Sequence, residues 1–357
     1  MNFDKKKIRK LLTGLAYGDS IGVTTEFCNT FFIPDLYEKF KHKGWPFKAV
    51  GKSQWNLSPG DHTDDTDMAW AIVKSCHENN KFDPEDIANE FVKWLDTNPT
   101  DIGNTTYRIL SKIRSGKYWY TVGKEDWERN KNNAANGSLM RNGIICGLTN
   151  DLNEAFEMTL LHGMITHYAP LPQLCCCIQT WLIYHFLNGV NKLKNSSWKK
   201  EFLQVFDNYR EKHCENEYVL DWFKNVDPKD IHYSQTTDLE WASNLLIPLL
   251  DNTKFNPFEY EIGKSSGYCL LTLQIALWAL QCGLEKDKIF IPPKNMPEEV
   301  FDKNGFDCLC WIPMIGYDAD TYAATAGPLF TACFGDLSIE RLSNLQINKW
   351  IDDLYNV

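Results

Sequence analysis

The spacing of apolar side chains predicts a chain built almost entirely of helices. Between residues 87 and 95, apolar residues recur at helical intervals, and Pro84 lies at the start, where a helix tolerates proline. Strand-like alternation of apolar and polar residues is scarce. Helices are predicted at residues 5–18, 67–79, 84–96, 104–115, 153–165, 171–189, 198–211, 266–282, 319–333 and 338–355. We therefore expect an all-α fold.

The same pattern shows no repeat of fixed period, no low-complexity segment and no clear domain boundary. Residues 1–357 are therefore expected to form a single compact multi-helix domain. Two stretches interrupt the apolar pattern: residues 190–262 are rich in polar side chains, and residues 285–312 are rich in proline and glycine. We expect both to be insertions at the surface.

Composition narrows the class of protein. A hydrophobic content of 43% with 13% aromatic residues supports a packed core, and a net charge of −10 argues against a nucleic-acid partner. The most apolar segment, residues 268–284, contains Gln274 and Gln281 and is expected to be a buried helix rather than a membrane span. Without a secretory signal or a CxxC pair, the twelve cysteines are expected to be buried thiols of a cytoplasmic, monomeric protein.

Two short acidic segments at opposite ends of the chain carry the strongest chemical signal. They are Thr63-Asp64-Asp65-Thr66-Asp67 and Asp318-Ala319-Asp320-Thr321. Each leads directly into a predicted helix, so either one alone could simply supply a helix cap. If the fold brings the two together, their carboxylates repel unless cations neutralise them. Oxygen-only sites select Mg²⁺, Mn²⁺ or Ca²⁺, and two such ions can activate a water molecule.

Further motifs give these segments a context. The chain contains, in order, Gly18-Asp19-Ser20-Ile21-Gly22 followed by Glu26, then Thr63-Asp64-Asp65-Thr66, Asn136-Gly137-Ser138, Thr166-His167 and Asp318-Ala319-Asp320-Thr321. This series resembles the ADP-ribosylglycohydrolase family over essentially the whole chain. The resemblance implies an all-α fold, a dinuclear centre of two divalent cations, Mg²⁺ or Mn²⁺, and release of ADP-ribose from ADP-ribosylated proteins. The segment Pro99-Thr100-Asp101-Ile102-Gly103-Asn104-Thr105-Thr106 resembles the branch of the dinitrogenase-reductase-activating glycohydrolase, which implies arginine as the favoured linkage.

The resemblance also assigns roles to residues of this chain. The implied metal ligands are Thr63, Asp64, Asp65, Asp318, Asp320 and Thr321. The implied catalytic residues are Glu26 and Asp101. The implied substrate-binding residues are Asp64, Gly103, Asn136, Gly137, Ser138, His167 and Tyr268.

Several of these residues could instead have purely structural roles. Asp101 could cap the helix predicted at 104–115, and a lone histidine such as His167 is often structural. Asp67 is left as a cap or a supporting acid, and Arg141 as a packing residue or a member of a structural ion pair. A different class of protein is also open: an inactive ADP-ribose-binding or structural protein, or a metallohydrolase of another phosphorylated small molecule. Because none of the six implied ligands is missing, the sequence favours the enzyme.

Overall fold

A computed structural model of the chain describes residues 3–52, 54–131, 133–194, 197–226, 255–260, 262–263, 266–285 and 292–355. The all-α prediction is confirmed: within these residues there are helices and a lone β-bridge between Ala135 and Tyr268, but no strand. None of the helices in these ranges is long and apolar enough to cross a membrane.

Most of the longer helices overlap predicted ranges, but α6 (Trp119–Arg129) and α12 (Glu217–Asn225) lie where no helix was predicted. The longer helices are α1 (Lys5–Gly22), α3 (Asp64–Asn79), α4 (Pro84–Asp96), α5 (Asn104–Arg114), α6 (Trp119–Arg129), α9 (Leu152–Met164), α10 (Pro170–Leu187), α11 (Trp198–Asn208), α12 (Glu217–Asn225), α14 (Cys269–Leu284), α16 (Ala319–Phe334) and α18 (Ile347–Tyr355). Shorter helical turns connect them: η1 (Val23–Thr25), η2 (Thr30–Phe32), α2 (Ile33–Phe40), η3 (Lys41–Lys43), α7 (Leu139–Asn142), α8 (Ile145–Leu148), η4 (Lys192–Lys194), η5 (Tyr209–His213), α15 (Glu298–Phe301), η9 (Gly305–Met314) and α17 (Ile339–Leu342).

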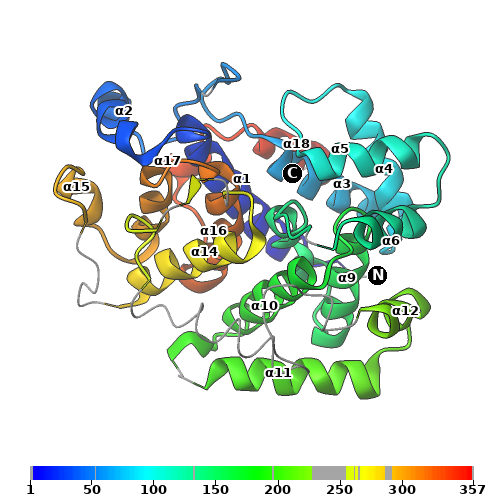
Figure 1. Cartoon of the computed structure of the whole chain (residues 1–357). Helices are drawn as coiled ribbons and strands as arrows, with labels where there is room; N and C mark the ends of the chain where they lie inside the picture. Colours follow the sequence, from blue (N-terminus) through cyan, green and yellow to red (C-terminus); the bar gives the residue numbers. More distant parts are fainter. Residues whose placement is uncertain are drawn as a thin grey trace.

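An unusually close pair of helices forms the centre of the molecule. Helices α1 and α16 lie against each other (Figure 1). Helix α1 carries glycines at four-residue spacing, and they face α16. A Cβ atom on Gly18 would lie 2.0 Å from the carbonyl oxygen of Ala323, so only glycine allows this approach. Gly22 meets the backbone of Asp320 in the same way, at 2.5 Å from its Cα atom. The glycine spacing therefore brings the end of α1 against the start of α16.

The prediction that residues 285–312 form a surface insertion is wrong for their last part. Residues from 305 onward form η9, whose side chains Cys308, Leu309 and Trp311 are buried against the core. The Trp311 indole donates a hydrogen bond to the Val300 carbonyl at 2.9 Å. Gly305, one of the residues that indicated a loop, instead begins a tight 3₁₀ segment. Residues 286–291 lie outside the described part of the chain.

The polar stretch 190–262 contains packed helices at its start. In α11, Phe202 and Phe206 are buried and their rings contact Phe156 of α9, with centroid separations of 6.4 and 5.5 Å. Helix α12 buries Val219 and Trp222. Residues 195–196, 227–254 and 261 of this stretch lie outside the described residues. Thus the described beginning of this stretch belongs to the packed domain.

Helix α14 and the C-terminal helices were also predicted from the sequence. Helix α14 is buried along Cys269–Leu280, as expected for a core helix. The helix predicted at 338–355 is instead two, α17 and α18, separated around Asn344. At this break the Gln346 amide donates to the Gly60 carbonyl, and a Cβ on Gly60 would lie 1.6 Å from the Asn344 oxygen. Contact with Gly60 thus replaces a continuous helix.

Candidate metal centre and active site

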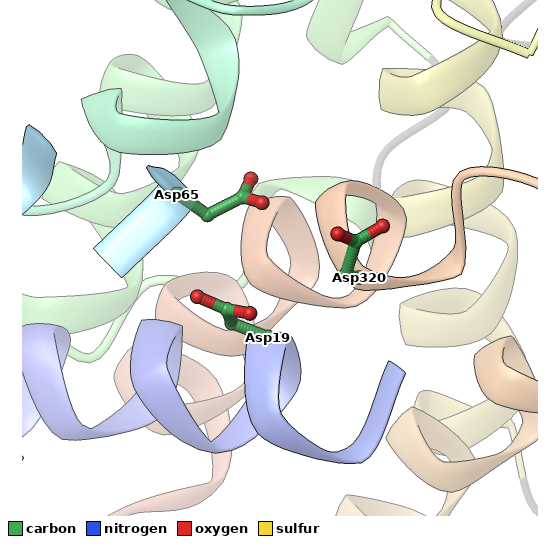
Figure 2. Close-up of side chains that lie close together, drawn as sticks. All are labelled: Asp19, Asp65 and Asp320. Carbon is green, nitrogen blue, oxygen red and sulfur yellow. The ribbon is translucent and has the colours of Figure 1, made fainter. Parts of the chain in front are cut away.

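The two acidic segments, distant in sequence, lie side by side in the fold. One carboxylate oxygen each of Asp19, Asp65 and Asp320 lies within 4.8 Å of the others, and the three residues come from α1, α3 and α16 (Figure 2). Oxygens of Glu26, Asp101 and Asp320 form a second group within the same distance. Asp320 belongs to both groups, so the two form one continuous acidic centre.

Asp19 was not among the residues predicted for the site, although it belongs to the glycine-rich motif. Its side chain is fully buried and accepts hydrogen bonds from the Thr63 and Thr66 amides at 3.1 and 3.2 Å. The Thr66 hydroxyl donates to it at 2.6 Å. A carboxylate from α1 therefore caps the start of α3 and fixes the Thr63–Thr66 turn. Asp19 is the one carboxylate within α1, and this was the available signal in the sequence.

The electrostatics of this centre are those of a cation site. Burial, and then the neighbouring carboxylates, hold the pKa values of Asp64, Asp65 and Asp320 well above their usual range. The Asp65 Oδ1 and Asp320 Oδ1 atoms are buried without a hydrogen-bond partner among the described residues. Buried acceptors without donors are costly, and divalent cations would satisfy both. The residues present therefore fit a metal centre.

The remaining implied ligands surround these atoms. The Thr63 hydroxyl lies 3.0 Å from both Asp19 Oδ1 and Asp65 Oδ2, and the Thr321 hydroxyl donates to Asp65 Oδ2 at 3.3 Å. Asp318 accepts a hydrogen bond from the Asn136 amide at 2.7 Å. All six implied ligands thus lie in or directly beside the acidic centre.

Glu26 and Asp101 approach the same centre from two loops. Burial and then the charge of Asp101 raise the pKa of Glu26 to about 9, while the Trp55 indole donates a hydrogen bond to its Oε2 at 3.0 Å. Burial also raises the pKa of Asp101. Asp101 does not cap α5, because the cap position is Gly103 and no side chain bonds there. The structure thus places Asp101 in the acidic centre rather than at a helix end.

A hollow of about 400 Å³ opens above these carboxylates. Of the residues implied by sequence, those lining it are Glu26, Asp64, Asp101, Gly103, Asn136, Gly137, His167, Asp318 and Thr321. A Cβ on Gly137 would lie 2.7 Å from the His167 ring, so glycine is needed for this wall to close. The hollow therefore combines an acidic floor with a wall of close-packed backbone.

Ser138 and Tyr268 are not among the residues that line the hollow. Ser138 is fully buried, and its hydroxyl accepts a weak hydrogen bond from the Cys176 thiol at 3.6 Å. Tyr268 is half-buried at the start of α14, while its neighbours Ser266 and Gly267 do line the hollow. Ser266, Gly267 and Thr106 all line the hollow, but the sequence did not identify them as site residues.

Arg141 supports the wall from behind. Its buried guanidinium donates to the Gly137 carbonyl at 2.9 Å and to the Thr166 hydroxyl at 2.7 Å. The Thr166 hydroxyl in turn lies 2.8 Å from His167 Nδ1. The described contacts of Arg141 include no ion pair, so the structural ion pair considered from sequence is replaced by hydrogen bonds to the wall of the hollow.

The raised carboxyl pKa values lead to a prediction for the protein without cations. Glu26, with its pKa raised from 4.5 to about 9, and Asp318, with its pKa raised to about 6, bind protons more tightly when folded. Their contribution to stability is present below the unfolded pKa values and is lost as pH rises through the folded ones. Removal of cations with EDTA is expected to lower the melting temperature more at pH 8 than at pH 6. Differential scanning calorimetry with and without Mg²⁺ measures both differences.

Single substitutions test whether the buried carboxylates cause this loss of stability in the cation-free protein. Asp65→Asn or Asp318→Asn should raise the melting temperature of the cation-free protein at pH 8, because each removes one buried negative charge. Turnover should be lost in both. A cation-free protein as stable as the Mg²⁺-bound protein at pH 8 would contradict the prediction.

Comparison with known proteins gives a consistent family signal. A family model described as ADP-ribosylglycohydrolase matches residues 2–356. ADP-ribosyl-[dinitrogen reductase] glycohydrolase of Rhodospirillum rubrum is 27% identical over 234 residues, which cover 63% of this chain and 72% of the relative. The ADP-ribosylarginine hydrolase Tri1 of Serratia proteamaculans is 24% identical, covering 98% of this chain and 75% of the relative.

One more relative and one solved structure complete the comparison. The ADP-ribosylhydrolase ARH3 of Xenopus tropicalis is 29% identical over 51% of each chain. A solved structure titled "ADP-ribosylglycohydrolase-related protein complex" superimposes with a TM-score of 0.62 at 20% identity, covering 98% of this chain and 96% of that one. At this identity the superposition shows a shared fold.

Proposed function

Because the chain belongs to the ADP-ribosylglycohydrolase family, we propose that it hydrolyses the bond between ADP-ribose and a modified protein side chain, with arginine as the favoured linkage. The observation that carries the proposal is the convergence of carboxylates from α1, α3 and α16 at the floor of a hollow of about 400 Å³. A hollow of this size suits a nucleotide-sized ligand. The carboxylates at the floor of the hollow suit cations that would act on the end of the ligand where the bond is broken.

We propose that six residues hold two divalent cations, Mg²⁺ or Mn²⁺. These are Thr63, Asp64, Asp65, Asp318, Asp320 and Thr321. Their carboxylate and hydroxyl oxygens are the donors that hard cations prefer. When bound, such cations orient ribose hydroxyls and lower the pKa of a bound water.

The wall of the hollow has the chemistry to hold the remainder of ADP-ribose. At Asn136-Gly137 the backbone comes close to the open space without a side chain on Gly137, which suits a diphosphate. His167 lines the hollow beside it and is held by Thr166. Binding energy from these remote contacts would position the scissile bond over the carboxylates.

The reaction requires a group that transfers a proton to the leaving nitrogen. Hydrolysis breaks the bond from the anomeric carbon to the guanidine nitrogen, whose electron pair stays on nitrogen, and water adds to the carbon. The proton lost by the water passes to that nitrogen. Asp101, with its raised pKa and its place between Glu26 and Asp64, is the residue we propose for this transfer. Glu26, held by Trp55, would orient the water.

Arginine linkage is favoured by the residues around the reacting bond. An anionic group beside the bond forms charge-assisted hydrogen bonds with a guanidinium, which a serine hydroxyl cannot match. Two of the relatives compared above are named for ADP-ribosylarginine or for dinitrogen reductase as substrate. We further propose that the protein acts in the cytoplasm as a monomer and releases ADP-ribose, with no nucleic-acid partner, in keeping with its charge of −10.

Product release from a panel of substrates tests the proposal. Peptides carrying ADP-ribose on arginine, serine or glutamate are incubated side by side with the protein and Mg²⁺ or Mn²⁺, and free ADP-ribose is quantified. We expect release from the arginine-linked peptide to be fastest. ADP-ribose binding without release from any peptide would instead indicate an inactive binding protein, and failure to bind ADP-ribose would indicate a hydrolase of another phosphorylated molecule.

A further inference from the structure

A second, smaller hollow adjoins the first on the far side of two carboxylates. It measures about 60 Å³ and shares Asp64 and Asp101 with the larger hollow. Its other walls include Trp55, His62 and Asp67. The reacting end of a ligand in the larger hollow would therefore lie directly at the entrance to the smaller one.

We propose that this smaller hollow is the subsite for the guanidinium of the arginine leaving group, with Trp55 and Asp67 as its specificity-determining residues. The inference rests on the proposed function, because it places the group that departs from the distal ribose. Its size admits a small planar group but no nucleotide, so it complements the larger hollow rather than duplicating it.

The charges around the smaller hollow favour a cation. Three of its lining side chains are carboxylates, those of Asp64, Asp67 and Asp101, and its described lining contains no lysine or arginine. Asp64 and Asp101 also face the proposed cation site, whereas Asp67 lies one turn further along α3. Asp67 is therefore the carboxylate that belongs to the smaller hollow alone.

Asp67 is held in place but keeps capacity for a ligand. Its Oδ1 lies 3.1 Å from His62 Nε2, and its Oδ2 accepts from the Trp94 indole at 2.9 Å. Each carboxylate oxygen has two lone pairs, and the side chain is 26% exposed. His62 lines the hollow as well, and its buried Nδ1 has no hydrogen-bond partner among the described residues. Asp67 thus presents carboxylate oxygens to the hollow whose bonding capacity a ligand could complete.

Trp55 adds a planar surface of the right kind. Guanidinium groups stack on aromatic rings, and indole is the most favourable of them. The Trp55 N–H edge is fixed by Glu26 at 3.0 Å, and its ring meets Phe27 edge-on at a centroid separation of 6.5 Å. The same residue therefore links the smaller hollow to a proposed catalytic carboxylate, so a correctly seated guanidinium would lie next to Glu26.

Two substitutions test the subsite by steady-state kinetics with an ADP-ribosyl-arginine peptide. Asp67→Asn keeps the shape of the side chain and removes its charge, and it should raise KM roughly tenfold or more. Trp55→Phe keeps an aromatic ring and removes the N–H to Glu26, so it should affect kcat more than KM. Trp55→Leu should raise KM as well. Asp35→Asn, which removes a charge from an exposed position in α2, is the matched control.

The affinity for free ADP-ribose, measured by calorimetry, decides whether the effect belongs to the leaving group. ADP-ribose lacks a guanidinium, so its Kd should stay within about twofold of the wild type in Asp67→Asn. An unchanged KM for the arginine-linked peptide, or equal losses for peptide and ADP-ribose, would overturn the subsite while leaving the proposed function intact. Absence of release by the wild-type protein from every peptide would overturn both.

Discussion

Replacing Asp64 and Asp320 together by alanine is expected to abolish binding of Mg²⁺ and Mn²⁺ and to reduce ADP-ribose release to the detection limit. The two residues come from α3 and α16, the helices that meet at the acidic centre. Loss of a single supporting partner of a metal ligand typically weakens metal affinity roughly 10–100-fold, so loss of two proposed ligands should exceed this. Isothermal titration calorimetry with each cation measures the first effect, and the peptide assay measures the second.

The fold should survive this change, which makes the result interpretable. Removing two buried carboxylates relieves repulsion, so the double variant should melt no lower than the cation-free wild type. Asp96→Ala/Asp336→Ala is the matched control, because it removes two negative charges from side chains that are 56% and 73% exposed. Unaltered cation binding in Asp64→Ala/Asp320→Ala would sink the proposed metal centre.

The convergence of the two acidic segments shows what the sequence could predict about this site. Each segment combines carboxylates and hydroxyls at the start of a helix, and that local pattern is legible without a structure. The four-residue spacing of the glycines that allow α1 to pack against α16 is also visible in the sequence. The role of Asp19 is not, because it depends on a contact between α1 and the first turn of α3. A carboxylate that caps another helix leaves no local pattern.

The helices themselves were predictable where aliphatic residues set the period. Helix α4 matches its predicted bounds, since its buried side chains are spaced for one face. Helix α6 was missed because its buried side chains are mostly Trp119, Tyr120 and Trp127 together with Gly123, which give a weak aliphatic period. At the start of η9, Gly305 indicated a loop, although the segment that follows it is buried. Burial of such a segment depends on neighbours that the local pattern does not contain.

Trp55 illustrates the same limit at the smaller hollow. It lies in an irregular segment between η3 and α3, and no motif in the sequence singled it out. Its hydrogen bond to Glu26 joins two residues separated by 29 positions. Specificity for a leaving group therefore resides partly in loops, whose positions follow from packing rather than from periodicity.

Asp101→Ala is expected to lower kcat for the arginine-linked peptide by roughly 10²-fold or more, as for loss of an acid–base group. Asp101 lies with Glu26 and Asp320 in one group of carboxylates and faces both hollows, so it adjoins the leaving nitrogen in the proposed arrangement. Asp101→Asn should lose a similar factor, because an amide keeps the shape but does not transfer the proton. Stopped assays of ADP-ribose release give kcat and KM for each variant.

The affinity for ADP-ribose separates chemistry from binding in this experiment. The proposed diphosphate contacts at Asn136-Gly137 lie on another wall of the hollow, so Kd for ADP-ribose should change far less than kcat. Asp96→Asn makes the same chemical change at an exposed side chain five positions earlier and should behave as wild type. If Asp101→Ala retains near wild-type turnover and the serine-linked peptide is cleaved preferentially, arginine preference cannot arise from this carboxylate. Glu26 would then be the remaining candidate for the proton transfer, because it is the other carboxylate that adjoins Asp320 in the same group.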